Sequence, residues 1–183
     1  MKVISGKYKG RNIIGFDIDG TRPTMDRVKE SLFAMIQTYI PESTVLDLFS
    51  GSGNLGIEAL SEGATFSYLV DKNSKACNII KKNLREIGIE DAEVNNLEYN
   101  KALSYYKENN ITFDIIFLDP PYKTNYIEES IDKISEYNLL KDDGIIICEN
   151  SSLDKIVYND QEYTEYKSKK YGDKWVVILK KIC

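Results

Sequence analysis

The apolar residues of this chain fall into short continuous runs, which alternate with segments where apolar residues recur every third or fourth position. The short runs are typical of buried strands, and the longer repeats are typical of amphipathic helices. The strands predicted in this way cover residues 45–49, 66–70, 92–96, 113–118 and 144–148. The helices predicted between them cover 54–62, 73–87 and 98–108, and a further helix carries Ile127, Ile131 and Ile134.

This alternation predicts an α/β fold with a mostly parallel central sheet, because parallel strands need a crossover helix between them. Right-handed crossovers place helices on both faces of such a sheet. If the strand order is 3-2-1-4-5, the first and fourth strands are neighbours, and a ligand binds at their carboxyl ends. Four residues with suitable chemistry lie just after predicted strands: Gly51, Asp71, Glu98 and Asp119.

The two ends of the chain follow a different pattern. Residues 2–14 favour a hairpin with its turn at 6–10, and a helix capped by Thr24 is expected from about 25 to 39. Two extended runs within 162–181 meet near Gly172-Asp173. That pattern predicts an antiparallel hairpin that closes the sheet.

The composition is ordinary for a globular protein, with 42% hydrophobic and 29% charged residues. We interpret residues 1–183 as a single domain, with the N-terminal hairpin and helix in 1–40 and the ligand-binding core in 41–183. The chain has no histidine, which excludes a histidine-based triad and argues against a catalytic zinc. Its three cysteines, Cys77, Cys148 and Cys183, lack metal-ligand spacing and favour reduced thiols in a cytoplasmic protein without a membrane span.

The net charge of −5 argues against a protein that coats nucleic acid without selectivity. The basic residues are nevertheless clustered. Residues 2–11 contain Lys2, Lys7, Lys9 and Arg11 without an acid, and residues 167–181 contain six lysines against one aspartate. Such clusters fit either a solvated face or a local contact with RNA.

A glycine-rich loop follows the first predicted strand. Gly51, Gly53 and Gly56 permit a tight turn and a close approach of the backbone to a ligand, and Asp71 has the spacing of a ribose-binding acid. These residues predict an adenosine-type ligand. Asp47 places a negative charge where a pyrophosphate would arrive, so a cationic ligand such as S-adenosylmethionine suits the loop better.

The sequence Asp119-Pro120-Pro121-Tyr122 follows the strand predicted at 113–118. Proline cannot extend a sheet, and it holds the preceding residue in an extended conformation. The Asp119 carboxylate and the Pro120 carbonyl can then accept hydrogen bonds from one planar NH₂ group while Tyr122 stacks on its ring. This arrangement favours the exocyclic amine of a nucleobase over a simple proline turn.

Four segments together resemble the RsmD-type 16S rRNA guanine-N2 methyltransferases over nearly the whole chain. They comprise residues 2–11, 21–33, 47–56 and 119–122, in the order and spacing of that family. One departure lies after the third strand, where the family commonly has an aspartate and this chain has residues 95–98, Asn-Asn-Leu-Glu. We expect Glu98 to replace that aspartate at the adenine edge.

The resemblance implies a Rossmann-like class I fold that uses S-adenosylmethionine, releases S-adenosylhomocysteine and needs no metal. It implies methylation of guanine N2 in 16S rRNA by a monomer, within a small ribosomal subunit or an assembly intermediate. The residues implied in catalysis are Asp119, Pro120 and Tyr122. Those implied in cofactor binding are Asp47, Gly51, Gly53, Gly56, Asp71, Glu98 and Asp119. Those implied in RNA binding are Lys7, Lys9, Arg11, Arg22 and Tyr122.

Two other functions stay open from the residues alone. An amino-methylase acting on adenine N6 in DNA or another RNA would use the same tetrapeptide, although 183 residues leave little room for a DNA-recognition region. An NAD-dependent enzyme or a non-catalytic nucleotide-binding module would use the same glycine-rich loop. Thermal stabilisation by S-adenosylmethionine or by NAD separates these alternatives.

Overall fold

The computed structural model describes residues 1–15, 23–121, 124–150 and 156–182. One seven-stranded sheet has the order β3-β2-β1-β4-β5-β7-β6, so the order 3-2-1-4-5 predicted for its first five strands is confirmed. The strands are β1 (Thr44–Asp47), β2 (Phe66–Val70), β3 (Ala92–Asn95), β4 (Phe113–Leu118), β5 (Leu140–Asn150), β6 (Tyr163–Tyr171) and β7 (Lys174–Lys181). The helices are α1 (Pro23–Ile36), α2 (Asn54–Ser61), α3 (Ser74–Ile87), α4 (Tyr99–Glu108) and α5 (Tyr126–Glu136).

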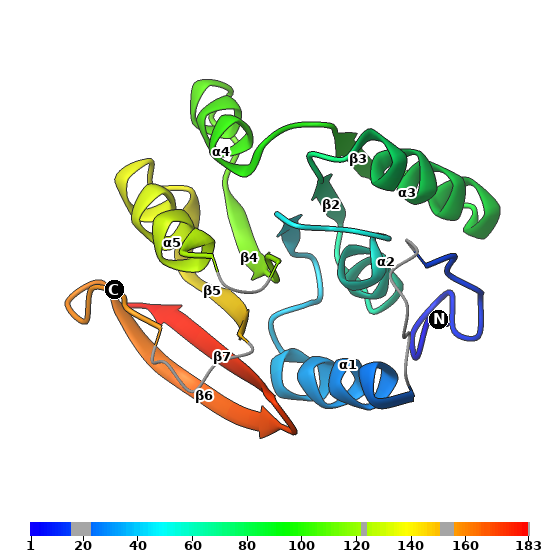
Figure 1. Ribbon diagram of the computed structural model, residues 1–183, viewed down its shortest axis with the longest axis horizontal. Coiled ribbons are helices and arrows are strands. Elements are labelled where there is room, and N and C mark those ends of the chain that lie inside the picture. The colour runs from blue at the N-terminus through cyan, green and yellow to red at the C-terminus, as the bar shows by residue number, and fades with distance from the viewer. Residues whose placement is uncertain (16–22, 122–123, 151–155, 183) are drawn as a thin grey trace.

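The sheet separates two apolar clusters, and Figure 1 shows α1, α2 and α3 on one side of it and α4 and α5 on the other. Alternate residues of a strand point to opposite faces. Phe117 of β4 therefore stacks on Phe33 of α1, with ring centroids 5.9 Å apart, whereas Ile116 and Leu118 join the cluster below α4 and α5. Burial on both faces explains why β4 is a continuous apolar run.

Strand register determines which residues meet at the carboxyl edge of the sheet. β1 and β5 flank β4 in parallel, with Asp47 opposite Phe117 and Cys148 opposite Leu118. β7 runs antiparallel to β5 and begins beside its end, with Trp175 opposite Asn150. The predicted C-terminal hairpin is confirmed, and its turn lies at the same edge as the carboxyl ends of β4 and β5.

The hairpin predicted for residues 2–14 is present as a short stretch of antiparallel pairing. It forms a single antiparallel bridge between Lys2 and Asn12, supported by backbone hydrogen bonds such as Val3 N to Arg11 O at 2.9 Å. The pairing is short because the backbone amides of residues 4, 5 and 7 bind α2 instead of the opposite arm. Ile4 and Ser5 donate to the buried carboxylate of Glu58 at 2.9–3.0 Å.

Asn83 of α3 joins this segment to the glycine-rich loop. Its Oδ1 accepts the amide of Ile14 at 2.9 Å, and its Nδ2 donates at 3.0 Å to the carbonyls of both Ile14 and Ser52. The Asn83 side chain is fully buried. One amide group thus ties together three segments that are far apart in the sequence.

Two other boundaries differ from the prediction. α1 begins at Pro23, so Thr24 lies inside the helix and does not cap it, and the helix ends at Ile36 rather than near residue 39. Proline is favoured in the first helical turn because its missing N–H has no partner there in any case. β5 begins at Leu140 rather than at 144, because Leu140 already pairs with Phe113 of β4; the next pair is Ile145 with Ile115, and residues 141–144 form an irregularity between them.

Candidate active site

Acidic side chains lie on one face of neighbouring strands at the carboxyl edge. Val45, Phe117 and Ile147 all belong to the apolar cluster under α1 and α2. Residues two positions further along each strand share that face. They are Asp47, Asp119 and Glu149.

Lys174 of β7 completes this row by forming an ion pair with Glu149. Both side chains are mostly buried, with 27% of Lys174 and 12% of Glu149 exposed. An ion pair with so little exposure to water is screened only weakly. No pattern in the sequence marks Glu149 or Lys174 as site residues, because their meeting depends on how β7 pairs with β5.

Burial and the charges of neighbouring carboxylates raise the pKa values of Asp47 and Asp119. Burial raises the pKa of Asp47 to about 7, although the Gly56 amide, donating to its Oδ2 at 3.2 Å, opposes that change. Burial also raises the pKa of Asp119, and the charge of Glu149 raises it further while Lys174 lowers it. Asp119 is therefore a better proton acceptor than an ordinary surface carboxylate.

The glycines of the loop have separate roles. Gly51 has a positive φ of 54°, and the space where a Cβ would stand is open, which leaves room for a ligand. Gly53 has φ 81° and precedes α2 in the left-handed conformation. A Cβ on Gly56 would lie 2.6 Å from Cδ2 of Leu69, so this glycine lets α2 pack closely on β2.

Asp71 follows β2 and orders the loop. Its Oδ2 accepts the Gly51 amide at 2.9 Å, and its Oδ1 accepts the Asn73 amide at 2.8 Å. A carboxylate has about four lone-pair positions, so about two stay available for the hydroxyls of a ribose. This geometry fits the ribose-binding role expected from the sequence.

Asn96, which follows β3, is hydrogen-bonded to the chain at Asp71, which follows β2. Its Nδ2 donates at 2.9 Å to the carbonyls of both Asp71 and Lys72. Glu98 is exposed at the start of α4 and accepts no capping hydrogen bond from that helix.

Three partly buried aromatic rings gather where the loop meets α4 and α5. Phe49 lies 5.6 Å from Tyr99 and 6.2 Å from Tyr126, and the last two rings are 4.8 Å apart. Tyr99 donates a hydrogen bond to Glu129, and burial together with that bond raises its pKa to about 12. The Phe49 and Tyr126 rings are parallel and the Tyr99 ring is tilted by 37° to both. The spacing of these residues in the sequence does not reveal the cluster.

The remaining predicted residues fall in different places. Pro120 is buried and Pro121 is exposed, while Tyr122 and Arg22 lie outside the described residues. The turn with Lys7 and Lys9 lies at the carboxyl end of α2, where the amide of Lys7 donates to the Ser61 carbonyl at 2.7 Å. α2 has eight residues. It is therefore about 12 Å long, and this basic turn lies at its far end from the glycine-rich loop.

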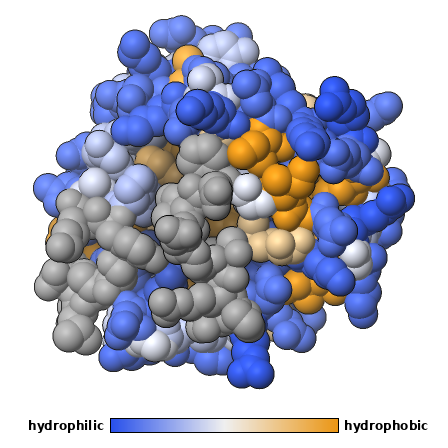
Figure 2. Space-filling view, turned by 45° about the vertical axis from the view of Figure 1, so that its right-hand side comes forward, coloured by the Kyte–Doolittle hydropathy of each residue, from blue (hydrophilic) through white to orange (hydrophobic). Residues whose placement is uncertain are grey.

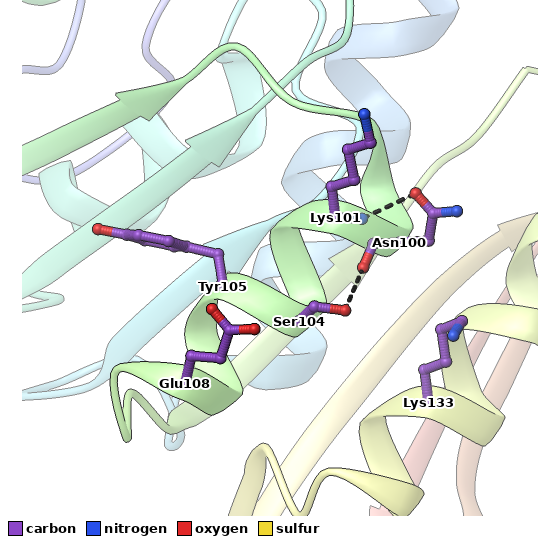
Figure 3. A pocket seen from close by; sticks show the side chains of 6 residues that line it. All are labelled: Asn100, Lys101, Ser104, Tyr105, Glu108 and Lys133. Atoms are coloured by element: carbon purple, nitrogen blue, oxygen red, sulfur yellow. Dashed lines mark hydrogen bonds between the residues drawn. The ribbon is translucent and has the colours of Figure 1, made fainter.

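A shallow pocket between α4 and α5 is separate from this edge. Figure 3 shows Asn100 and Ser104 of α4 joined by a hydrogen bond, with Lys133 of α5 across from them. None of Asp47, Asp71 or Asp119 lines this pocket. It lies between the outer faces of the two helices, so it is no part of the candidate site.

A family model described as "Conserved hypothetical protein 95" matches residues 1–180. Ribosomal RNA small subunit methyltransferase D of Haemophilus influenzae is 38% identical over 176 residues, which cover 94% of this chain and 89% of that protein. The chain belongs to the RsmD family of rRNA small subunit methyltransferases. The Escherichia coli protein of the same name is 33% identical over 82% of this chain and 74% of its own length.

Solved structures agree with membership of the RsmD family. The protein yhhF from Escherichia coli superposes with a TM-score of 0.87 at 29% identity, over 99% of this chain and 97% of that one. SMU.776, solved with S-adenosylhomocysteine, has a TM-score of 0.65 at 17% identity, over 81% of this chain and 49% of that one. At that identity the likeness shows the fold alone, and the Rossmann-like class predicted from the sequence is confirmed.

Cys77 and Cys148 are free, buried cysteines, and Cys183 lies outside the described residues. Across the described ranges, no three or more histidine, cysteine, aspartate or glutamate side chains are grouped so that they could hold a metal ion. In the same ranges, no helix has the length and apolar character needed to cross a membrane. The face in Figure 2 is largely hydrophilic, with one group of apolar residues beside the grey atoms.

Proposed function

We propose that this RsmD-family enzyme transfers a methyl group from S-adenosylmethionine to the exocyclic N2 of a guanine in 16S rRNA. The family's own target, guanine 966 in reference rRNA numbering, is the proposed site. The observation that carries the proposal is the half-buried Asp119 at the end of β4, beside Glu149 and followed by two prolines. The Asp119 carboxylate can accept a hydrogen bond from an amine and can then accept its proton.

The glycine-rich loop and Asp71 fit the cofactor. We assign the ribose hydroxyls to Asp71, and the adenine amine to Asn96 or Glu98. The open space at Gly51 and the negative row of Asp47 and Asp119 suit a ligand with a sulfonium and an ammonium. When bound, S-adenosylmethionine supplies a methyl group that its sulfonium already activates.

Guanine N2 is a poor nucleophile because its lone pair is delocalised into the ring. Hydrogen bonds from the amine to the Asp119 carboxylate and the Pro120 carbonyl would hold it in line with the methyl group and favour a pyramidal nitrogen. In-line placement at roughly 3 Å can lower a barrier by several kcal/mol. As the C–N bond forms, the methyl–sulfur bond breaks and S-adenosylhomocysteine leaves, while the Asp119 carboxylate would accept the proton that N2 gives up.

The substrate contacts are part of the same proposal. Tyr122 stacks on a guanine swung out of its RNA context, which offsets part of the few kcal/mol that unstacking costs. Lys7, Lys9, Arg11 and Arg22 contact the RNA backbone, and the protein acts as a monomer on a small subunit or an assembly intermediate in the cytoplasm. The exposed side chains of Lys7, Lys9 and Arg11 leave them free to do so.

The test is to incubate the enzyme with labelled S-adenosylmethionine and either undermethylated small subunits or naked 16S rRNA, and then to identify the labelled nucleoside. We expect N2-methylguanosine. Asp119→Ala should abolish the label, Asp119→Asn should keep part of it, and Tyr122→Ala should lose far more than Tyr122→Phe. Label in N6-methyladenosine, or thermal stabilisation by NAD without transfer, would contradict the proposal in favour of one of the alternatives.

A further inference from the structure

The end of the β6–β7 hairpin is rich in lysine and aromatic residues. Lys169, Lys170 and Tyr171 precede the turn, and Lys174 and Trp175 follow it. Lys170 lies over the Trp175 ring, with its Nζ 5.7 Å from the centroid. We call these five residues the hairpin tip.

The hairpin tip stands at the catalytic edge of the sheet. Trp175 is opposite Asn150 at the end of β5, and Lys174 reaches Glu149 beside Asp119. Figure 1 shows β6 and β7 at one end of the sheet, with α1 beside them. A nucleic acid that delivers a base to Asp119 therefore passes close to this hairpin.

Two lysines of the hairpin tip keep their charge available. Lys169 and Lys170 are exposed, and within the described part of the chain neither forms an ion pair. Lys169 donates one hydrogen bond to Ser31 of α1 at 3.1 Å, which orients its ammonium and leaves it two further donors. As neighbours on β6, the two side chains point to opposite faces of the hairpin, Lys169 toward Ser31 of α1 and Lys170 toward Trp175, so a phosphate backbone that crosses the hairpin tip meets one ammonium group on each side.

We propose that Lys169 and Lys170 bind backbone phosphates of the RNA segment that carries the target base. Lysine is a point charge with several donors, which suits phosphate, and such contacts position a nucleic acid without reading its sequence. The proposal rests on the proposed function, since it places the RNA strand beside Asp119. This RNA contact is separate from the one proposed for Lys7 and Lys9, because those two lysines lie at the end of α2 far from the glycine-rich loop.

The test compares two charge-matched double variants. Lys169→Gln with Lys170→Gln removes the two phosphate-binding ammonium groups. Lys107→Gln with Lys133→Gln is the control, because these lysines also lie over an aromatic ring, Tyr137, with Nζ 4.5 and 5.4 Å from its centroid. They occupy the last turns of α4 and α5, away from the carboxyl edge.

Binding to in-vitro-transcribed 16S rRNA is measured at several salt concentrations. The hairpin variant should bind roughly tenfold more weakly near 0.1 M salt, and its slope of log K against log salt should flatten by about 0.7 to 0.9 for each phosphate that it no longer neutralises. The control should keep the wild-type slope. S-adenosylmethionine should raise the melting temperature of all three proteins equally.

A hairpin variant with the wild-type slope and affinity would overturn the inference, as would an equal loss in both double variants. The proposed function fails separately. If the wild-type enzyme methylates no guanine N2 in undermethylated small subunits, the chemistry is wrong, whatever the salt slopes are. If the wild-type enzyme methylates that amine and the slopes do not differ, only the binding of RNA by the hairpin is wrong.

Discussion

The buried ion pair between Glu58 and Lys29 anchors the N-terminal segment, and Glu58→Gln tests how strongly. The Glu58 carboxylate is fully buried and lies 2.6 Å from the Lys29 ammonium, while it also accepts the amides of Ile4 and Ser5. A glutamine keeps one acceptor oxygen, but its NH₂ group must face these donors. The substitution leaves a buried ammonium without its counter-charge.

Breaking a buried ion pair by removing one partner costs about 3–5 kcal/mol. A protein of this size loses about 2–4 °C of melting temperature for each kcal/mol. We therefore expect Glu58→Gln to melt about 6–20 °C below the wild type. The same free energy is a large part of the roughly 5–15 kcal/mol that stabilises a typical domain.

Urea denaturation and thermal melting measure the loss, and hydrogen exchange locates it at the amides of Ile4 and Ser5. The control is Glu86→Gln, which removes the acid of an exposed pair with Lys82 at 3.8 Å and should cost less than about 0.5 kcal/mol. Equal losses in the two variants would refute the reasoning. So would full protection of the Ile4 and Ser5 amides in Glu58→Gln.

Three further substitutions probe the site itself. Glu149→Gln removes a charge that raises the pKa of Asp119, so the part of the kcat/KM profile that rises with pH should move to lower pH. An unchanged profile would remove Glu149 from the site. Gly56→Ala should lower the free energy of unfolding, measured by urea denaturation, by about 1–3 kcal/mol, because its new methyl would lie 2.6 Å from Leu69. An unchanged free energy would contradict the close packing of α2 on β2. Asp71→Asn should weaken S-adenosylmethionine binding in calorimetry because the ribose hydroxyls lose an acceptor, and wild-type affinity would show that the ribose lies elsewhere.

The parallel core could be predicted because its sequence signals are local. The run Phe113–Leu118 is apolar throughout since both faces of β4 are covered, and Gly88 ends α3 in the left-handed conformation, as its place after a helical repeat suggests. Gly51 and Asp71 are recognisable because a loop that binds a nucleotide-like ligand has a characteristic spacing.

The rest of the site depends on interactions that no local pattern encodes. Glu149 and Lys174 meet only because β7 pairs antiparallel with the end of β5. The N-terminal pattern predicts a hairpin, but it does not show that the amides of Ile4 and Ser5 bind the carboxylate of Glu58, more than 50 residues away. Pro23 is the first residue of α1, although Thr24 is of a residue type that commonly precedes and caps a helix.

The Asn83 side chain has a consequence for how the protein assembles. Its hydrogen bonds to Ile14 and Ser52 span 69 and 31 residues of chain, so they form only after the ends of two long loops have met. Because one buried amide serves both segments, docking of residues 1–15 and ordering of the glycine-rich loop are coupled. A chain whose first segment has not docked lacks one support of that loop, and we expect its affinity for a ligand there to be lower.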